Sequence, residues 1–197
     1  MRELALDYLG YLLNLASTVF LPVVALELLG SRQASVFAVA WLTSSTLDLL
    51  ATNVGTALTV ETTYGEDPAA LRRTVLRRAM PIVASASLLG ALAAPLILRL
   101  YGDQYSESGT LVLQLLLLAS VPRALVVFCV AEARAHRDMR FIVWLRGQNT
   151  TVTLGLAWVL APLYGARGMA LAWLLAQTWG AVTALWHALK VRPMAVP

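Results

Sequence analysis

The stretch GTLVLQLLLLASVPRALVVFCVA, residues 109–131, decides the fold class of this chain. It is apolar almost throughout and long enough to cross a bilayer, because a transmembrane helix needs about 20 such residues. Arg123 nevertheless lies near its middle, and a guanidinium keeps its proton at that depth. A central arginine costs roughly 2.5–3.5 kcal/mol on insertion scales, so we expect Arg123 to face a bundle interior or a watery cavity and to have an acidic partner.

The composition of the whole chain agrees with a membrane protein. Hydrophobic residues make up 59% and charged residues 13% of the sequence, and the mean hydropathy is +0.71, far from the balance of a soluble domain. The net charge of +4 does not indicate nucleic-acid binding, because the basic residues fall in short loops between apolar runs. Such a distribution is typical of positive-inside topology.

Six apolar runs predict an all-α, polytopic membrane bundle with residues 1–197 as a single transmembrane domain. Basic residues gather on the side that holds both termini, which predicts that the N and C termini are cytoplasmic. A short amphipathic helix over 68–79 is expected at the cytoplasmic headgroups, capped by Asp67 and started by Pro68. The expected spans are 4–29, 34–60, 81–100, 109–131, 141–160 and 168–189.

Two prolines are expected to bend their helices, because proline cannot donate to the helix ladder and clashes with the preceding turn. Pro22 lies in the first expected span, and Pro122 lies beside Arg123 in the fourth. A tight polar turn over 29–33 is expected between the first two spans, since glycine readily ends a helix.

Asp48 is the predicted partner of Arg123. Counted from the outer ends of their spans, both residues lie at about the same depth at 1.5 Å per residue. A salt bridge that holds the bundle together and a role in substrate or proton movement are both consistent with such a pair. Asn14 and Asn53 add polar groups at depth, whereas Arg146 is expected to extend to the inner surface from its place near the end of the fifth span.

The sequence predicts neither an enzyme nor a cofactor or metal site. It has no paired carboxylates at a membrane surface, no Gly-rich phosphate loop and no nucleophile elbow. Cys129 is the single cysteine, and His136 and His187 are far apart without metal-ligand spacing. A helical bundle with proline bends and an internal polar set is instead typical of a pathway for a polar solute.

Residues 162–173, PLYGARGMALAW, resemble the last outer turn of polysaccharide flippases of the multidrug/oligosaccharidyl-lipid/polysaccharide exporter superfamily. The shared pattern is proline, an aromatic residue and glycine, then Gly-x-Ala-x-Ala entering a helix. LYGDQY at 100–105 is also similar to that family, as is LLG at 28–30 followed by Ala34, Phe37 and Ala40.

The resemblance implies a carrier that flips or exports a lipid-linked oligosaccharide or polysaccharide precursor across the plasma membrane by alternating access. Members have two lobes around a central cationic cavity, and this chain resembles the second lobe, so a first-lobe partner or a second copy is expected. Arg123 would contact a pyrophosphate or acidic sugar, with Asn14, Asp48 and Asn53 beside it. A drug or cation antiporter that depends on Asp48 protonation and a scaffold without transport are the alternatives.

Overall fold

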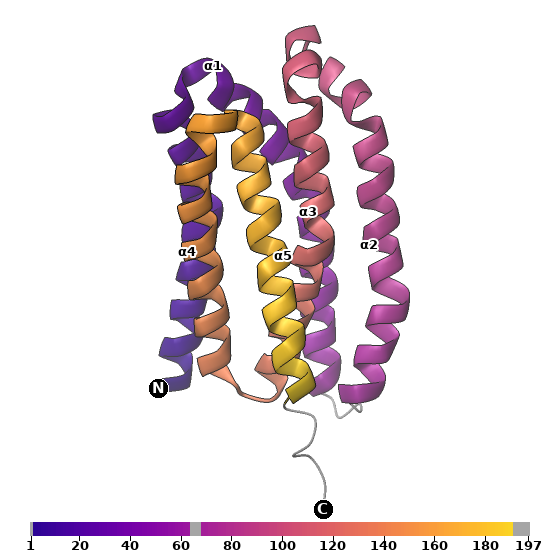
Figure 1. Ribbon diagram of the computed structural model, residues 1–197. Helices are drawn as coiled ribbons and strands as arrows, with labels where there is room; N and C mark the ends of the chain where they lie inside the picture. The colour runs from indigo at the N-terminus through magenta and orange to yellow at the C-terminus, as the bar shows by residue number, and fades with distance from the viewer. Residues whose placement is uncertain (1, 64–67, 191–197) are drawn as a thin grey trace, which may run out of the picture.

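A computed structural model describes residues 2–63 and 68–190, and within these ranges the chain is a bundle of five helices without strands (Figure 1). The predicted all-α class is therefore confirmed. Asp67, the expected helix cap, lies outside the described residues. The helices are α1 (Arg2–Thr63), α2 (Pro68–Arg99), α3 (Asp103–Ala135), α4 (Met139–Tyr164) and α5 (Ala166–Lys190).

Helix α1 contains a sharp kink at Gly30. Its 62 residues would extend roughly 90 Å if straight, about three times the thickness of a bilayer core. Gly30 has φ 71° and ψ 171°, a conformation that costs glycine little and other residues more. In Figure 1 the first half of α1 rises along the bundle and the second half descends behind α3. The polar turn expected over 29–33 is thus reduced to a kink at a single residue.

The other boundaries differ from expectation in three places. Helix α2 is continuous and combines the expected surface helix over 68–79 with the expected span over 81–100. No glycine or polar turn separates the two, and Pro81 lies inside the helix. Helix α3 begins at Asp103 rather than at residue 109, because the chain turns within residues 100–102. Pro22 and Pro122 both lie inside helices that continue past them.

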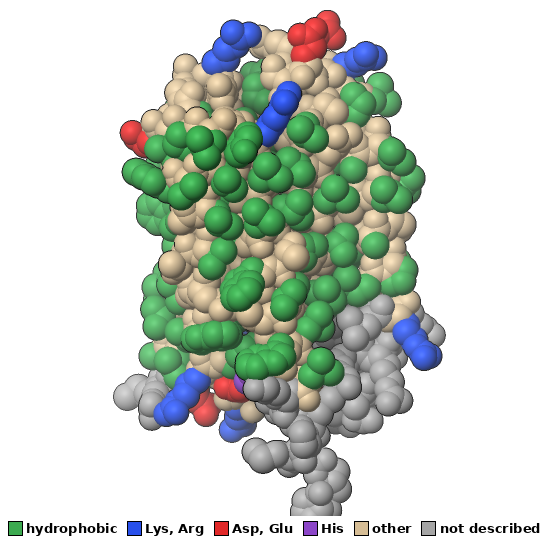
Figure 2. All heavy atoms as spheres, viewed as in Figure 1, with side chains coloured by type: hydrophobic (Ala, Val, Ile, Leu, Met, Phe, Trp, Pro, Cys, Tyr) green, Lys and Arg blue, Asp and Glu red, His purple; other side chains and the backbone are tan. Residues whose placement is uncertain are grey.

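Four helical segments are long and apolar enough to cross a membrane, which supports a multi-pass membrane protein. Helix α4, which contains the expected span 141–160, is not among them, because it carries polar residues over 148–151. On the face drawn in Figure 2, charged side chains gather at the two ends and hydrophobic ones cover the middle. The four segments are Ala5–Thr46, Ala79–Arg99, Asp103–Arg134 and Ala166–Leu189.

Helices α3 and α5 lie at the centre of the packing. Helix α3 contacts α1, α2 and α5, and α4 packs between α1 and α5. Trp173 of α5 is 2% exposed and meets Trp41 of α1 edge to face, with ring centroids 4.7 Å apart. Small side chains let the helix backbones approach closely, as is usual in membranes. The fully buried alanines include Ala25, Ala40, Ala94, Ala119, Ala124, Ala157, Ala170, Ala172, Ala176 and Ala184.

Side-chain contacts join the helix ends on both sides of the bundle. At the end that holds the α1 kink, the backbone N–H of Ala166 donates to Gln33 Oε1 at 3.3 Å. At the opposite end, Arg134 Nη2 lies 3.1 Å from Asp7 Oδ1, and His187 Nε2 lies 3.2 Å from Asp138 Oδ2. These contacts connect segments that are far apart in the sequence.

Candidate functional site

The predicted ion pair is present in the bundle interior. Arg123 Nε on α3 lies 3.1 Å from Asp48 Oδ2 on the second half of α1, and the two side chains are 14% and 16% exposed. The guanidinium carbon of Arg123 is also 5.0 Å from the centroid of the Trp173 ring. An arginine over a tryptophan face is attracted by the ring quadrupole. The charge of Arg123 is therefore held between a carboxylate and an aromatic face.

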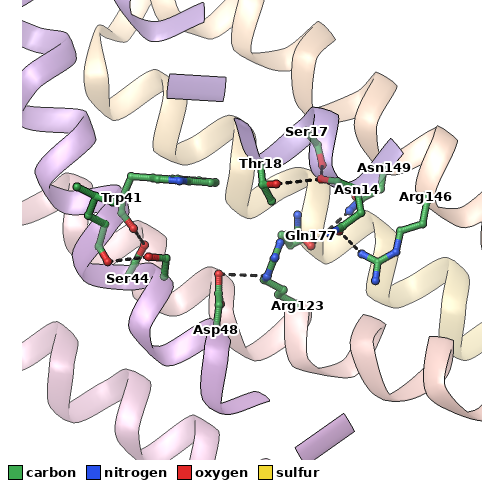
Figure 3. Close-up of polar contacts among 12 residues, drawn as sticks. Asn14, Ser17, Thr18, Trp41, Ser44, Asp48, Arg123, Arg146, Asn149 and Gln177 are labelled. Atoms are coloured by element: carbon green, nitrogen blue, oxygen red, sulfur yellow. Dashed lines mark hydrogen bonds and ion pairs between the residues drawn. The ribbon is translucent and has the colours of Figure 1, made fainter. Parts of the chain in front are cut away.

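Arg146 does not extend to the end of the bundle, contrary to expectation. Its Nη1 donates to Asn14 Oδ1 on the first half of α1, as Figure 3 shows. One turn further along α4, the Thr150 hydroxyl donates to the backbone oxygen of Leu13 at 2.8 Å. Arg146 points inward because it shares the α1-facing side of α4 with Thr150, since residues four apart lie on one helix face.

A buried amide pair lies beside these arginines. Asn149 Nδ2 on α4 donates to Gln177 Oε1 on α5 at 3.3 Å, and the two residues are 5% and 1% exposed. Asn149 Oδ1 and Gln177 Nε2 have no hydrogen-bond partner within residues 2–63 and 68–190. An unsatisfied buried polar atom costs about 1–3 kcal/mol, so groups of this kind are usually satisfied by water or a ligand.

We call the set formed by these residues the interior polar cluster. Figure 3 shows its members converging from α1, α3, α4 and α5. The cluster has two guanidinium groups and one carboxylate, so it has an excess positive charge inside an apolar bundle. Such an arrangement can bind an anion or support movement of a charged solute. The members are Asn14, Asp48, Arg123, Arg146, Asn149 and Gln177.

The structure brings together three of the four residues expected along a substrate pathway. Asn14, Asp48 and Arg123 belong to the interior polar cluster, whereas Asn53 is exposed. Asn53 follows Asp48 by five residues, which places it about 140° around the helix at about 100° per residue. It therefore faces away from the cluster.

The sequence reasoning missed Arg146 and Asn149. Because Arg146 lies near the inner end of its expected span, its side chain was expected to reach the surface. Its spacing from other polar residues of α4 indicates instead that it points into the bundle. Residue 146 lies three and four positions before Asn149 and Thr150, which are both buried. A polar set with helical spacing inside an expected span indicates a face that is turned toward the bundle.

The chain was compared with protein-family models, with curated proteins and with solved structures, and none of the three comparisons gave a match.

Proposed function

We propose that the chain is one lobe of a membrane transporter that moves a lipid-linked oligosaccharide or polysaccharide precursor across the cell membrane by alternating access. The observation that carries the proposal is the interior polar cluster, because charged side chains inside a membrane bundle are costly and usually mark a pathway. The resemblance of residues 162–173, 100–105 and 28–40 to polysaccharide flippases supports the substrate class.

The proposed topology has six crossings with both termini in the cytoplasm. Helix α1 supplies two of them, on either side of Gly30, and α4 supplies the fifth despite its polar residues. The N-terminal end of α1 and the C-terminal end of α5 lie at the same end of the bundle in Figure 1, which is compatible with an even number of crossings. The excess of arginine in the segments expected at that end supports a cytoplasmic orientation.

In the proposed mechanism, an anionic headgroup enters the bundle near Asn14, Asp48 and Arg123. The interior polar cluster would replace part of its hydration with fixed dipoles and charges. Bending near Pro22 and Pro122 would then change which side of the membrane the headgroup can reach.

A second lobe is part of the proposal, because the resemblance covers half of a two-lobed carrier. The partner would be a first-lobe chain or a second copy of this chain. The test is the mass of the protein in mild detergent, alone and co-expressed with a candidate first-lobe chain. We expect a dimer or a stoichiometric complex, and a stable monomer under both conditions would contradict a transport role for the chain.

A drug or cation antiporter is the second candidate, because Asp48 is an acidic side chain inside the bundle and could exchange a proton. The Asp48→Asn variant separates the two functions in vesicles that contain the assembled transporter. For an antiporter we expect this variant to lose efflux driven by a pH gradient. For a flippase we expect glycolipid export to continue in the absence of that gradient.

A scaffold without transport would tolerate an apolar pair in place of Asp48 and Arg123. Replacing a buried ion pair by packed apolar residues is often neutral or stabilising. In the same vesicles, normal glycolipid export after the double replacement Asp48→Leu and Arg123→Leu would therefore remove this pair from the proposed pathway.

A further inference from the structure

We infer that Arg146, together with Asn14, forms the anion-binding site of this interior, and that its ligand is a phosphate-type oxyanion. This inference rests on the proposed function and deepens it, because it assigns the contact with the anionic headgroup to a residue pair between α1 and α4. Arg123, which was expected to contact the substrate, instead stabilises the bundle through its ion pair with Asp48.

The first argument is charge balance. Ion pairs join Asp48 to Arg123, Asp7 to Arg134 and Asp138 to His187. None of these ion pairs includes Arg146, whose side-chain contact is the neutral amide oxygen of Asn14. The other guanidinium of the interior polar cluster, that of Arg123, carries the same positive charge. An anion at Arg146 would therefore add negative charge to a cluster that contains two guanidinium groups and one carboxylate.

The second argument is hydrogen-bonding capacity. A guanidinium has five N–H donors, and Asn14 accepts from Nη1 of Arg146. Gln177 Nε2 is a further donor of the interior polar cluster without an acceptor among the described residues. Guanidinium groups bind the oxygens of phosphate in a bidentate fork. The unsatisfied amide donor of Gln177 and the positive charge of Arg146 favour an oxyanion over a cation.

The third argument is the contrast with Arg123. Its Nε faces Asp48 at 3.1 Å, and the ring of Trp173 lies 5.0 Å from its guanidinium carbon. A ligand that took Arg123 would have to displace a carboxylate and leave Asp48 uncompensated. Arg146 can accept an anion without breaking any ion pair of the described residues.

The test uses the full chain in nanodiscs of phosphatidylcholine with a small fraction of phosphatidic acid. The measurement is retention of phosphatidic acid over phosphatidylcholine by native mass spectrometry. Arg146→Gln should lower that preference about tenfold or more, since hydrogen bonds between charged groups are strong. Arg140→Gln, which changes an exposed arginine on the same helix, should keep it. An unchanged preference in Arg146→Gln would overturn the inference.

Asn14→Asp provides a second, independent variant. It places a carboxylate opposite Arg146 with almost no change in size. This carboxylate should pair with Arg146 in place of an added oxyanion. We expect this variant to fold, to unfold at a higher temperature than the wild type, and to lose the preference for phosphatidic acid. Retention of the full preference by Asn14→Asp would also overturn the inference, even if Arg146→Gln failed to fold.

Two further arms identify the source of the oxyanion and separate the inference from the proposed function. Competition by added inorganic pyrophosphate would assign the site to free phosphate compounds, and its failure to compete would assign the site to lipid headgroups; both results uphold an oxyanion site at Arg146. If Arg146→Gln loses lipid binding while glycolipid export by the assembled transporter is unchanged, the binding site stands and its proposed role in transport fails.

Discussion

Gln33 and Ala166 are joined by a hydrogen bond although 133 residues separate them. The side-chain oxygen of Gln33, just after the α1 kink, accepts from the backbone N–H of Ala166 at the start of α5. Gly165, which precedes Ala166, has φ 60° and lies against the Gln33 side chain. The contact therefore ties the kink of α1 to the turn between α4 and α5.

Replacing Gln33 by Ala should lower the free energy of unfolding by about 1 kcal/mol, the net worth of a typical hydrogen bond. The measurement is denaturation in a mixed-micelle titration with sodium dodecyl sulfate. Ser35→Ala is the control, because the exposed Ser35 hydroxyl bonds only to the nearby Arg32 backbone oxygen among the described contacts. A loss as large in Ser35→Ala as in Gln33→Ala would contradict the proposed tie.

The Asp48–Arg123 pair predicts strong coupling between its two residues. Asp48→Asn or Arg123→Gln alone leaves one buried charge uncompensated and should cost about 3–5 kcal/mol. The double variant should cost much less than the sum of the two single changes, because it removes both charges. A double-mutant cycle of thermal unfolding in detergent measures this coupling. Additive losses would show that the pair contributes nothing beyond its separate side chains.

Gly30 and Gly155 form a matched pair for testing the kink. A Cβ added at either position meets nothing within 4 Å, but Gly30 has φ +71° whereas Gly155 is helical. Gly30→Ala should therefore destabilise the protein by roughly 1–3 kcal/mol, because φ 71° with ψ 171° lies in a region that essentially only glycine adopts. Gly155→Ala should be neutral or stabilise it by up to about 1 kcal/mol. Equal changes in unfolding temperature would refute a conformational role for Gly30.

Asp138 has two roles that substitution can separate. Its Oδ1 accepts from the backbone N–H of Phe141 at 3.2 Å, and its Oδ2 lies 3.2 Å from His187 Nε2. Asp138→Asn preserves a good helix cap and removes the charge, whereas Asp138→Ala removes both contacts. We expect Asp138→Ala to cost about 1 kcal/mol more than Asp138→Asn. Hydrogen exchange at the start of α4 should show the same order, and identical exchange would contradict the capping role.

The sequence was sufficient to predict the helical class and the Asp48–Arg123 pair, because both follow from apolar length and from depth along a helix. It was less informative about helix ends. The chain continues as helix through Pro81 because an isolated proline removes one hydrogen bond but does not supply a turn. The fourth span was expected to begin at residue 109, whereas α3 begins at Asp103, because polar residues can continue a helix beyond its apolar span.

The inward direction of Arg146 could not be derived from depth alone, because direction depends on which neighbour α4 packs against. Its partner, Asn14, lies on the first half of α1, which packs on α4 through a contact remote in sequence. The same limit applies to Asn53, whose exposure follows from rotation around α1. Depth along a span is fixed by counting residues, whereas rotation is fixed by tertiary packing.

The kink at Gly30 has a mechanical consequence. A turn at a single residue leaves no spare length between the two halves of α1. Neither half can therefore shift along its own axis without moving the other half. The Gln33 contact adds a second restraint at the same end. The two halves must therefore move together, and the contact between Asp7 and Arg134 restrains the first half at its other end.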